Sequence, residues 1–304
     1  MKKKGFSLAL TLWIVAILSL LSAYYLNYGK KVVKKSRELQ TKLHLVLEAE
    51  SMVELIKFYG STGVLVENRI ENRLLGEKIK SFPDKLFIDS RKMVWDNSTI
   101  ILQDAAGLID INDKEVIAEY VAENKEKKAI IKDSMSDWYD YDDFSSLNGA
   151  EKGYYTGNHY SLPVRNEHYF SAAEELFLIR GLDHLSKLQQ KKLRSNLILS
   201  DGGGTYNFFT LKDDILKSRY ALTSNDMEQL KKAKAKGLEV FKNTFYTLNK
   251  RHSMSFEEDG MYPSSILRGH IITSFKNIRE KIEFVIDFNV KSEEKIFEVL
   301  YYKN

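Results

Sequence analysis

The N-terminal 27 residues constrain this chain more than any other stretch. Three consecutive lysines and Gly5 form a short basic leader, and the run from Phe6 to Asn27 contains no charged side chain. A helix of about 20 apolar residues, rising about 1.5 Å per residue, is long enough to cross a bilayer. Because unpaired backbone polar groups are costly in lipid, a helix is the expected form. We therefore predict an N-terminal membrane-spanning helix.

Three interpretations of this segment remain open. A secretory signal peptide has a shorter apolar core and a small-x-small cleavage site, whereas this run is longer and ends in Ala23-Tyr-Tyr-Leu-Asn27. A plain membrane anchor needs only the span. The third interpretation is a class III signal, in which a basic leader ends in Gly and is followed by Phe and a long apolar helix that stays on the mature protein.

The junction Lys2–Phe6 resembles that of type IV pilin-like proteins. This resemblance implies that prepilin peptidase cleaves between Gly5 and Phe6 and that the new N-terminus is methylated. Most pilins carry Glu at the fifth mature position, where it pairs with a neighbouring subunit's N-terminal amine; here that position is Leu10. A buried charge without its partner is costly, so a subunit at the end of a filament can do without it. The K-type minor pseudopilin of type II secretion resembles this case.

Composition is that of a globular protein of one or two domains besides the anchor: 304 residues, of which 43% are hydrophobic and 29% charged. The 46 basic residues face 42 acidic ones. Their signs alternate, as in Glu123–Lys128, which is typical of a solvated surface and disfavours a nucleic-acid interface. The chain has no cysteine, which excludes disulfides and thiol chemistry.

The orientation of the span is undecided by charge, because basic residues lie on both of its sides: Lys2–Lys4 before it and five more between residues 30 and 37. The family resemblance implies a single-pass inner-membrane protein with a cytoplasmic leader and the bulk of the chain in the periplasm.

The N-terminal helix is expected to continue to about Tyr59. Only Gly29 interrupts the stretch between Phe6 and Gly60, which has no proline. Beyond Gly29, six apolar residues recur at intervals of three or four positions, so their side chains form one stripe along the helix. We expect this stripe to pack on a sheet: Leu39, Leu43, Val46, Ala49, Val53 and Ile56. Gly60–Gly63 ends the helix.

Short extended runs lie on both sides of a helical block. Residues 64–82 are expected to form a further helix that ends before Pro83. A hairpin is expected at 92–103, around the turn residues Asp96–Ser98. The expected strands cover residues 85–89, 92–95, 99–103, 268–274, 281–290 and 296–302.

Helical periodicity dominates the middle of the chain, with a capping box at Ser171–Glu174. The expected helices cover residues 116–121, 128–138, 171–181, 185–199, 211–217 and 224–236. We therefore expect an α+β fold in which a long N-terminal helix packs on an antiparallel sheet and a large α-helical domain is inserted into that sheet. The expected divisions are 1–5 (leader), 6–27 (transmembrane half of the helix), 28–104 (pilin-like helix and first strands), 105–240 (inserted domain) and 241–304 (C-terminal strands).

Residues 133–151 hold the densest cluster of acidic side chains. Hard oxygen ligands on a loop suit Ca²⁺, which takes six to eight oxygens. Counted as a 12-residue loop from Asp140, the segment places Asp142 and Glu151 at ligand positions, but Phe144 stands where an EF-hand has a ligand, so it is not an EF-hand. The candidate ligands are Asp140, Asp142, Asp143 and Glu151. Asp137 is expected to cap or orient the loop, and a merely solvated acidic loop stays open.

Several motifs resemble the signature of minor pseudopilin K of type II secretion, the general secretion pathway protein K family. They are Gly107–Asn112, Asp137–Asp143, Asn148–Glu151, Tyr154-Tyr155, Val164–Asn166, Glu174–Leu176 and Ile179–Gly181, with Asn207–Thr210 as a weaker match. The resemblance covers the N-terminus and about residues 104–182; the C-terminal third matches only by strand pattern. It implies a pilin-like fold with a large inserted helical domain, and calcium binding.

Enzymatic motifs are absent from the sequence: it has no Gly-x-Ser-x-Gly, Walker A or zinc-protease pattern, and the acidic loop defines no nucleophile. The histidines have no metal-ligand spacing: His44, His159, His168, His184, His252 and His270. We therefore expect a structural protein and no enzyme.

The expected function is that of a minor pseudopilin at the tip of the type II secretion pseudopilus, which initiates or caps assembly and supports export across the outer membrane. The resemblance implies as partners the other minor pseudopilins, the major pseudopilin and prepilin peptidase, and no nucleic acid. Two alternatives stay open: a tip subunit of a type IV or competence pilus that contacts DNA or a surface, and a membrane-anchored extracytoplasmic enzyme that uses the acidic loop.

Overall fold

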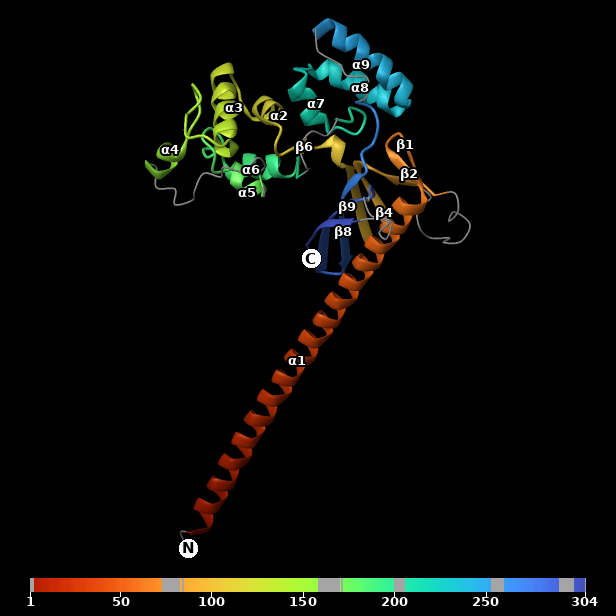
Figure 1. The fold of residues 1–304 in the computed structure, drawn as a ribbon. Helices are drawn as coiled ribbons and strands as arrows, with labels where there is room; N and C mark the ends of the chain where they lie inside the picture. Colours follow the sequence, from red (N-terminus) through yellow and green to blue (C-terminus); the bar gives the residue numbers. More distant parts are fainter. Residues whose placement is uncertain are drawn as a thin grey trace.

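One unbroken helix, α1 (Lys3–Thr62), dominates the computed structural model (Figure 1). Its 60 residues give a length of about 90 Å at about 1.5 Å per residue. The structure describes residues 3–72, 83, 85–157, 170, 172–199, 206–252, 260–289 and 298–303. All side chains from Leu8 to Gln40 are exposed, so the first two thirds of α1 project away from the rest of the chain. The predicted helix from Phe6 to Tyr59 is confirmed.

The apolar part of α1 meets the requirements of a membrane span by length and composition. Three of its hydroxyl side chains make local hydrogen bonds: those of Thr11, Ser19 and Ser22 each donate to a backbone carbonyl three or four residues earlier, at 2.8 Å. These hydroxyls therefore need no partner outside the helix. The N-terminal half of α1 is a candidate membrane anchor.

The upper part of α1 packs on a five-stranded antiparallel sheet in the order β10-β9-β8-β5-β4. The strands are β4 (Asp89–Trp95), β5 (Ser98–Asp104), β8 (Ile266–Phe275), β9 (Ile278–Asp287) and β10 (Glu298–Lys303). Ile271 of β8 lies between Ile100 and Ile282 of its two neighbours. Strands from both ends of the chain thus complete one sheet, as expected. The end of the expected strand 281–290 and the start of the expected strand 296–302 lie outside the described residues, which exclude 290–297.

The buried face of α1 begins later than the periodicity predicted. It consists of Leu45, Ala49, Met52, Val53, Ile56 and Tyr59. Leu39 and Leu43 are 59% and 61% exposed, so the expectation that they pack on the sheet is wrong, and Val46 is only half-buried. Leu47, which lies along the helix between the buried Leu45 and Ala49, is also 53% exposed, so the side of α1 that carries Leu39, Leu43 and Leu47 points away from the sheet. On the side that faces the sheet, the Thr273 hydroxyl of β8 donates to the Leu45 carbonyl at 3.1 Å.

The helix expected over residues 64–82 is replaced by a hairpin. β1 (Val64–Val66) and β2 (Arg69–Glu71) pair with each other, and β2 also pairs with β3 (Lys85–Phe87) in a three-stranded antiparallel sheet. Glu67 turns the chain between them with φ of 55°. Valine favours strands over helices because it is β-branched. Residues 73–82 lie outside the described part of the chain.

The helical block is inserted between β5 and β8, which are neighbours in the sheet. Its helices are α2 (Lys114–Val121), α3 (Lys125–Tyr139), α4 (Lys152–Gly157), α5 (Ala173–Leu176), α6 (Lys187–Arg194), α7 (Asp213–Arg219), α8 (Ser224–Ala235) and α9 (Leu238–His252). They form a hydrophobic core of their own, separate from the core between α1 and the sheet. The helices continue to His252, past the expected end of the block at residue 240.

Two local helix predictions are wrong. The helix expected at 171–181 is the single turn α5, whose N-cap, Ala172, makes no side-chain hydrogen bond; Ser171 lies outside the described residues. The helix expected at 185–199 ends at Arg194. It is followed by β7 (Leu197–Ile198), which pairs in parallel with β6 (Ile109–Asp110). A pairing between segments so distant in sequence leaves no local pattern.

Candidate metal centre

Three carboxylates converge where α3 ends and α4 begins. Asp137 lies in the last turn of α3, Asp140 is its C-cap, and Glu151 directly precedes α4. One carboxylate oxygen from each lies within 4.8 Å of the other two. The side chains of Asp137 and Glu151 are buried, and that of Asp140 is half-buried. This is the acidic cluster.

The loop between these carboxylates is held in place by α3. Asp137 accepts hydrogen bonds from the Ser146 amide at 3.0 Å and from the Ser146 hydroxyl at 2.5 Å. One turn earlier, Asp133 accepts from the amide and the side chain of Asn148 at 3.1 and 3.0 Å. Gly149 packs directly on Asp137, and a Cβ there would overlap the carboxylate. Glycine is therefore required at that position.

The neighbouring signature residues support the same loop. Arg180 donates to the Gly149 carbonyl at 2.9 Å, and Gly181 follows it with φ of +90°, a conformation that favours glycine. The rings of Trp138 and Tyr155 pack edge to face with centroids 5.0 Å apart. The arginine, the glycine and the two aromatic residues thus support the loop that places Glu151 beside Asp140. Val164–Asn166, another part of the signature, lies outside the described residues.

The electrostatics of the acidic cluster favour a cation. Burial, together with Asp140 and Asp137, raises the pKa of Glu151 to about 7. Burial and the neighbouring carboxylates also raise the pKa of Asp140. Asp140 Oδ1 and Glu151 Oε1 are buried and have no hydrogen-bond partner. Buried polar atoms are normally satisfied, so these two oxygens fit a divalent cation that takes oxygen ligands.

The candidate ligands predicted from the sequence are not all brought together. Asp140 and Glu151 lie in the acidic cluster, whereas Asp142 and Asp143 are exposed on the same loop outside it. Asp142 accepts the Phe144 amide at 2.9 Å. Asp137 orients the loop, as expected, and is also a member of the cluster. The anchoring role of Asp133 was missed by the sequence reasoning.

Histidine contributes to no metal cluster within the described ranges. Two of the six histidines, His159 and His168, lie outside those ranges.

Another buried carboxylate, that of Asp104, joins the helical block to the sheet. It ends β5 and accepts five hydrogen bonds from both sides of the insertion. Oδ1 accepts from the Ala106 amide at 3.2 Å and from the Ser264 amide and hydroxyl at 3.0 and 2.6 Å. Oδ2 accepts from Asn207 at 2.9 Å and Thr210 at 2.8 Å. The chain's exit from the sheet and its return are thus fixed by one side chain.

The motif residues of this junction pack around Asp104. Gln103 donates to the Thr210 carbonyl at 3.0 Å. Gly107 lies so close to Gln103 and Thr210 that a Cβ would overlap both. The sequence indicated the motifs Gly107–Asn112 and Asn207–Thr210, but not that they meet at Asp104. The sequence signal that could have indicated this junction was an aspartate at the end of a strand, three residues before a glycine.

Comparisons with known proteins agree with this fold. No protein-family model matches the sequence, and a search of curated proteins finds no significant match. Among solved structures, the chain is similar to one chain of the GspK–GspI–GspJ complex of the type 2 secretion system from enterotoxigenic Escherichia coli. The TM-score is 0.55 at 15% sequence identity, and the alignment covers 88% of this chain and 98% of the other. The likeness confirms the pilin-like α+β fold with its long N-terminal helix.

Proposed function

We propose that this chain is a minor pseudopilin of a type II secretion system that sits at the tip of the pseudopilus. There it initiates or caps assembly and supports protein export across the outer membrane. Two independent lines support this proposal. The sequence motifs resemble pseudopilin K, and the fold is similar to a chain of a complex that contains GspK. The chain's partners are then the other minor pseudopilins and the major pseudopilin.

The outward face of α1 is the observation that carries the proposal. Leu39, Leu43 and Leu47 follow one another at steps of four and are 59%, 61% and 53% exposed. A row of leucines at this spacing forms one apolar stripe on a helix. Contiguous exposed apolar surface marks sites of protein contact. The outer leucine stripe, as we name these three residues, fits a helix of a neighbouring subunit.

The position at the tip rests on the absence of a carboxylate from the membrane part of α1. No acidic residue lies between Phe6 and Asn27, and Leu10 stands at the fifth position of the proposed mature chain. This subunit therefore offers no carboxylate to the N-terminal amine of a subunit above it. Such a chain suits the end of a filament.

Processing is expected between Gly5 and Phe6, by prepilin peptidase on the cytoplasmic side. The intact mass of the protein purified from membranes should correspond to a chain that begins at Phe6, with methylation adding the mass of one methyl group. A control with Gly5→Leu should retain the leader, because the peptidase requires a small residue at the junction. An N-terminus beyond Ala23 would instead identify a secretory signal peptide and end this proposal.

The acidic cluster is proposed to hold Ca²⁺ through Asp137, Asp140 and Glu151. Bound calcium supplies positive charge that offsets the repulsion among buried carboxylates. The chain's own residues orient the ligands: Asp133 and Asp137 fix the loop through Asn148 and Ser146. The ion thereby stabilises one conformation of the helical block, and the role is structural.

Calcium is expected to raise the melting temperature of the full chain in detergent micelles, relative to the same protein in chelator. At about 100-fold excess over Kd the stabilisation is about 2.7 kcal/mol, which corresponds to several degrees. Asp140→Asn with Glu151→Gln should abolish this difference. The matched pair Asp142→Asn with Asp143→Asn should retain most of it. If instead the Asp142 and Asp143 variant lost the calcium-dependent rise and the Asp140 and Glu151 variant kept it, the ligands would lie on the exposed part of the loop. If calcium did not raise the melting temperature of the wild type, the proposed calcium site would be wrong.

The calcium effect should depend on pH in a defined direction. The pKa of Glu151 is raised from 4.5 to about 7 in the folded, calcium-free protein. Its contribution to stability is therefore present below about pH 4.5 and is lost as the pH rises to 7. Calcium should reverse that loss. Below pH 7 a proton competes for Glu151, so the apparent affinity should fall by up to about tenfold per pH unit. In Glu151→Gln the part of this pH dependence that comes from Glu151 should disappear, which leaves the contribution of Asp140, whose pKa is also raised.

A further inference from the structure

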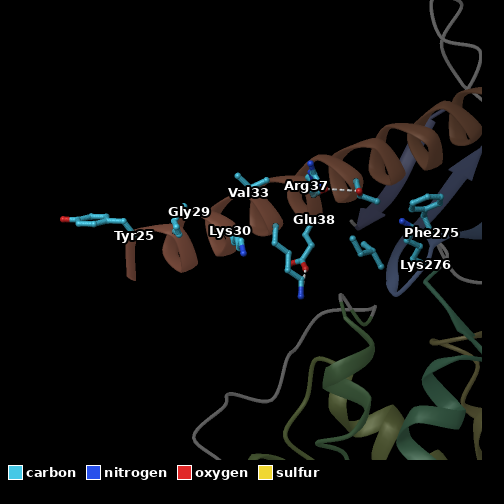
Figure 2. Close-up of a pocket in the computed structure, with 12 residues that line it drawn as sticks. Tyr25, Gly29, Lys30, Val33, Arg37, Glu38, Phe275 and Lys276 are labelled. Carbon is cyan, nitrogen blue, oxygen red and sulfur yellow. Dashed lines mark hydrogen bonds and ion pairs between the residues drawn. The ribbon is translucent and has the colours of Figure 1, made fainter. Parts of the chain in front are cut away.

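A groove lies between α1 and the turn of the β8–β9 hairpin, just past the apolar run (Figure 2). Its volume is about 730 Å³. Tyr25 and Leu26, at one end, belong to the apolar run; Thr41 and Phe275 line the other end. The part of α1 from Asn27 to Thr41 rises about 21 Å. If the apolar run spans a bilayer, the end of the groove at Tyr25 and Leu26 lies at the depth of the lipid headgroups, and the end at Thr41 and Phe275 lies beyond them.

The floor of this groove is apolar. Its apolar lining residues are Leu26 and Val33 of α1 and Phe275 and Ile278 of the hairpin. Phe275 stands beside the turn of the hairpin, where polar residues are usual, and its aromatic side chain is 45% exposed. In Figure 2 it lies beside Lys276 at the end of the hairpin, next to α1.

The rim of the groove is cationic. Lys30, Lys34 and Arg37 follow α1 at steps of four and three, and Lys276 joins them from the hairpin. Glu38 is the one acidic residue among the lining residues, which leaves four cations against one anion. It lies 4.0 Å from Lys34, with both side chains exposed, and exposed pairs of this kind are weak. The rim therefore keeps a net positive charge.

We propose that this groove binds an anionic phospholipid of the bilayer that α1 crosses. The phosphate would lie among the basic side chains of α1, and the upper part of an acyl chain would lie against Leu26 at the end of the apolar run. Basic residues near an anionic membrane surface each contribute about 1 kcal/mol. Gly29 has no neighbour within 4 Å, so it leaves the helix surface open between Leu26 and Lys30. The proposal needs only a membrane-spanning α1 and does not depend on assembly into a pseudopilus.

Charge also argues against a second copy of this chain as the occupant. A copy anchored at the same depth would bring its own basic segment, residues 30–37, against Lys30, Lys34 and Arg37. Like charges at close range are destabilising. A helix from a different subunit is the remaining competitor, and the experiment separates it from a lipid.

The test uses the full chain reconstituted into vesicles of phosphatidylcholine mixed with phosphatidylglycerol. Native mass spectrometry after release from the vesicles identifies the phospholipids that remain bound. The groove variant is Lys34→Gln with Arg37→Gln. The control is Lys31→Gln with Lys35→Gln, which removes the same charge at the same depth from side chains that do not line the groove. All four side chains are exposed, so neither variant should alter the melting temperature.

The wild type and the control should retain phosphatidylglycerol in excess of its share in the vesicle. In the groove variant this excess should fall about tenfold or more, since each basic residue contributes roughly fivefold in binding. An equal loss in both variants would indicate a general basic surface and overturn the groove. No excess in the wild type would also overturn it. Capture of the same two variants from native membranes tests the competitor: if the groove variant lost a sibling subunit that the control retained, the groove would be assigned to a partner helix.

Discussion

Replacing Ile56 with aspartate is expected to unfold the sheet together with the helix that covers it. Ile56 has no exposed surface and lies in the core that contains Ile271, Ile282 and Phe284 of the sheet. The substitution removes a buried apolar side chain and places an unpaired charge there. Such a charge costs about 3–5 kcal/mol, a large part of the 5–15 kcal/mol that stabilises a typical domain. Thermal unfolding of the full chain in detergent, followed by near-UV circular dichroism, measures the loss.

The matched control is Leu43→Asp. It is the same kind of change on the same helix, but Leu43 is 61% exposed. Its effect on the melting temperature should be small, because exposed substitutions usually change stability by less than about 0.5 kcal/mol. If the two variants melted at the same temperature, Ile56 would not lie in the core.

Asp104→Ala is expected to loosen the attachment of the helical block to the sheet. The substitution leaves two backbone amides and the side chains of Asn207, Thr210 and Ser264 without their shared acceptor. Each buried donor left unpaired costs about 1–3 kcal/mol, so the total should reach several kcal/mol. Hydrogen exchange should speed up at residues 206–211 and at the start of β8, while the centre of the sheet remains protected.

Thr210→Val provides the graded comparison for Asp104. It removes a single donor, preserves the shape of the side chain, and leaves four hydrogen bonds to the carboxylate. The expected cost is about 1 kcal/mol, the usual contribution of one hydrogen bond. Equal destabilisation by Asp104→Ala and Thr210→Val would contradict the role of Asp104 as the shared acceptor.

Local patterns predicted the elements of the fold, and long-range packing decided their limits. Apolar residues at helical spacing identified α1, and alternation identified the strands that became β8 and β9. The pattern could not reveal which side of α1 the sheet covers, which is why Leu39 and Leu43 were assigned to the wrong surface. The hairpin at 64–71 was missed because valines that follow a helix end are compatible with a further helix or with a strand. The pairing of β2 with β3, which the local sequence does not show, selects the strand.

At the candidate metal centre, too, the local sequence predicted the segment, and long-range contacts decided which residues meet. The density of carboxylates indicated the loop, and Asp140 and Glu151 were among the residues named. Which carboxylates converge depends on Asp137, whose contacts with Ser146 and Gly149 lie nine and twelve residues away. The support from Arg180 is more distant still. Spacing within the loop could not distinguish the clustered side chains from Asp142 and Asp143, which face solvent.

The central claim is that α1 assembles this chain with other pseudopilins, and the most direct measurement is capture of the full chain from native membranes of its own cell. Mass spectrometry of the captured material should identify the other minor pseudopilins and the major pseudopilin. Leu39→Asp with Leu43→Asp, which alters the outer leucine stripe, should lose these subunits and melt like the wild type. Lys31→Gln with Lys35→Gln changes the charge by the same two units at exposed positions of α1 outside that stripe and should retain them. Capture of no pseudopilin by the wild type, or equal capture by the stripe variant, would contradict the account.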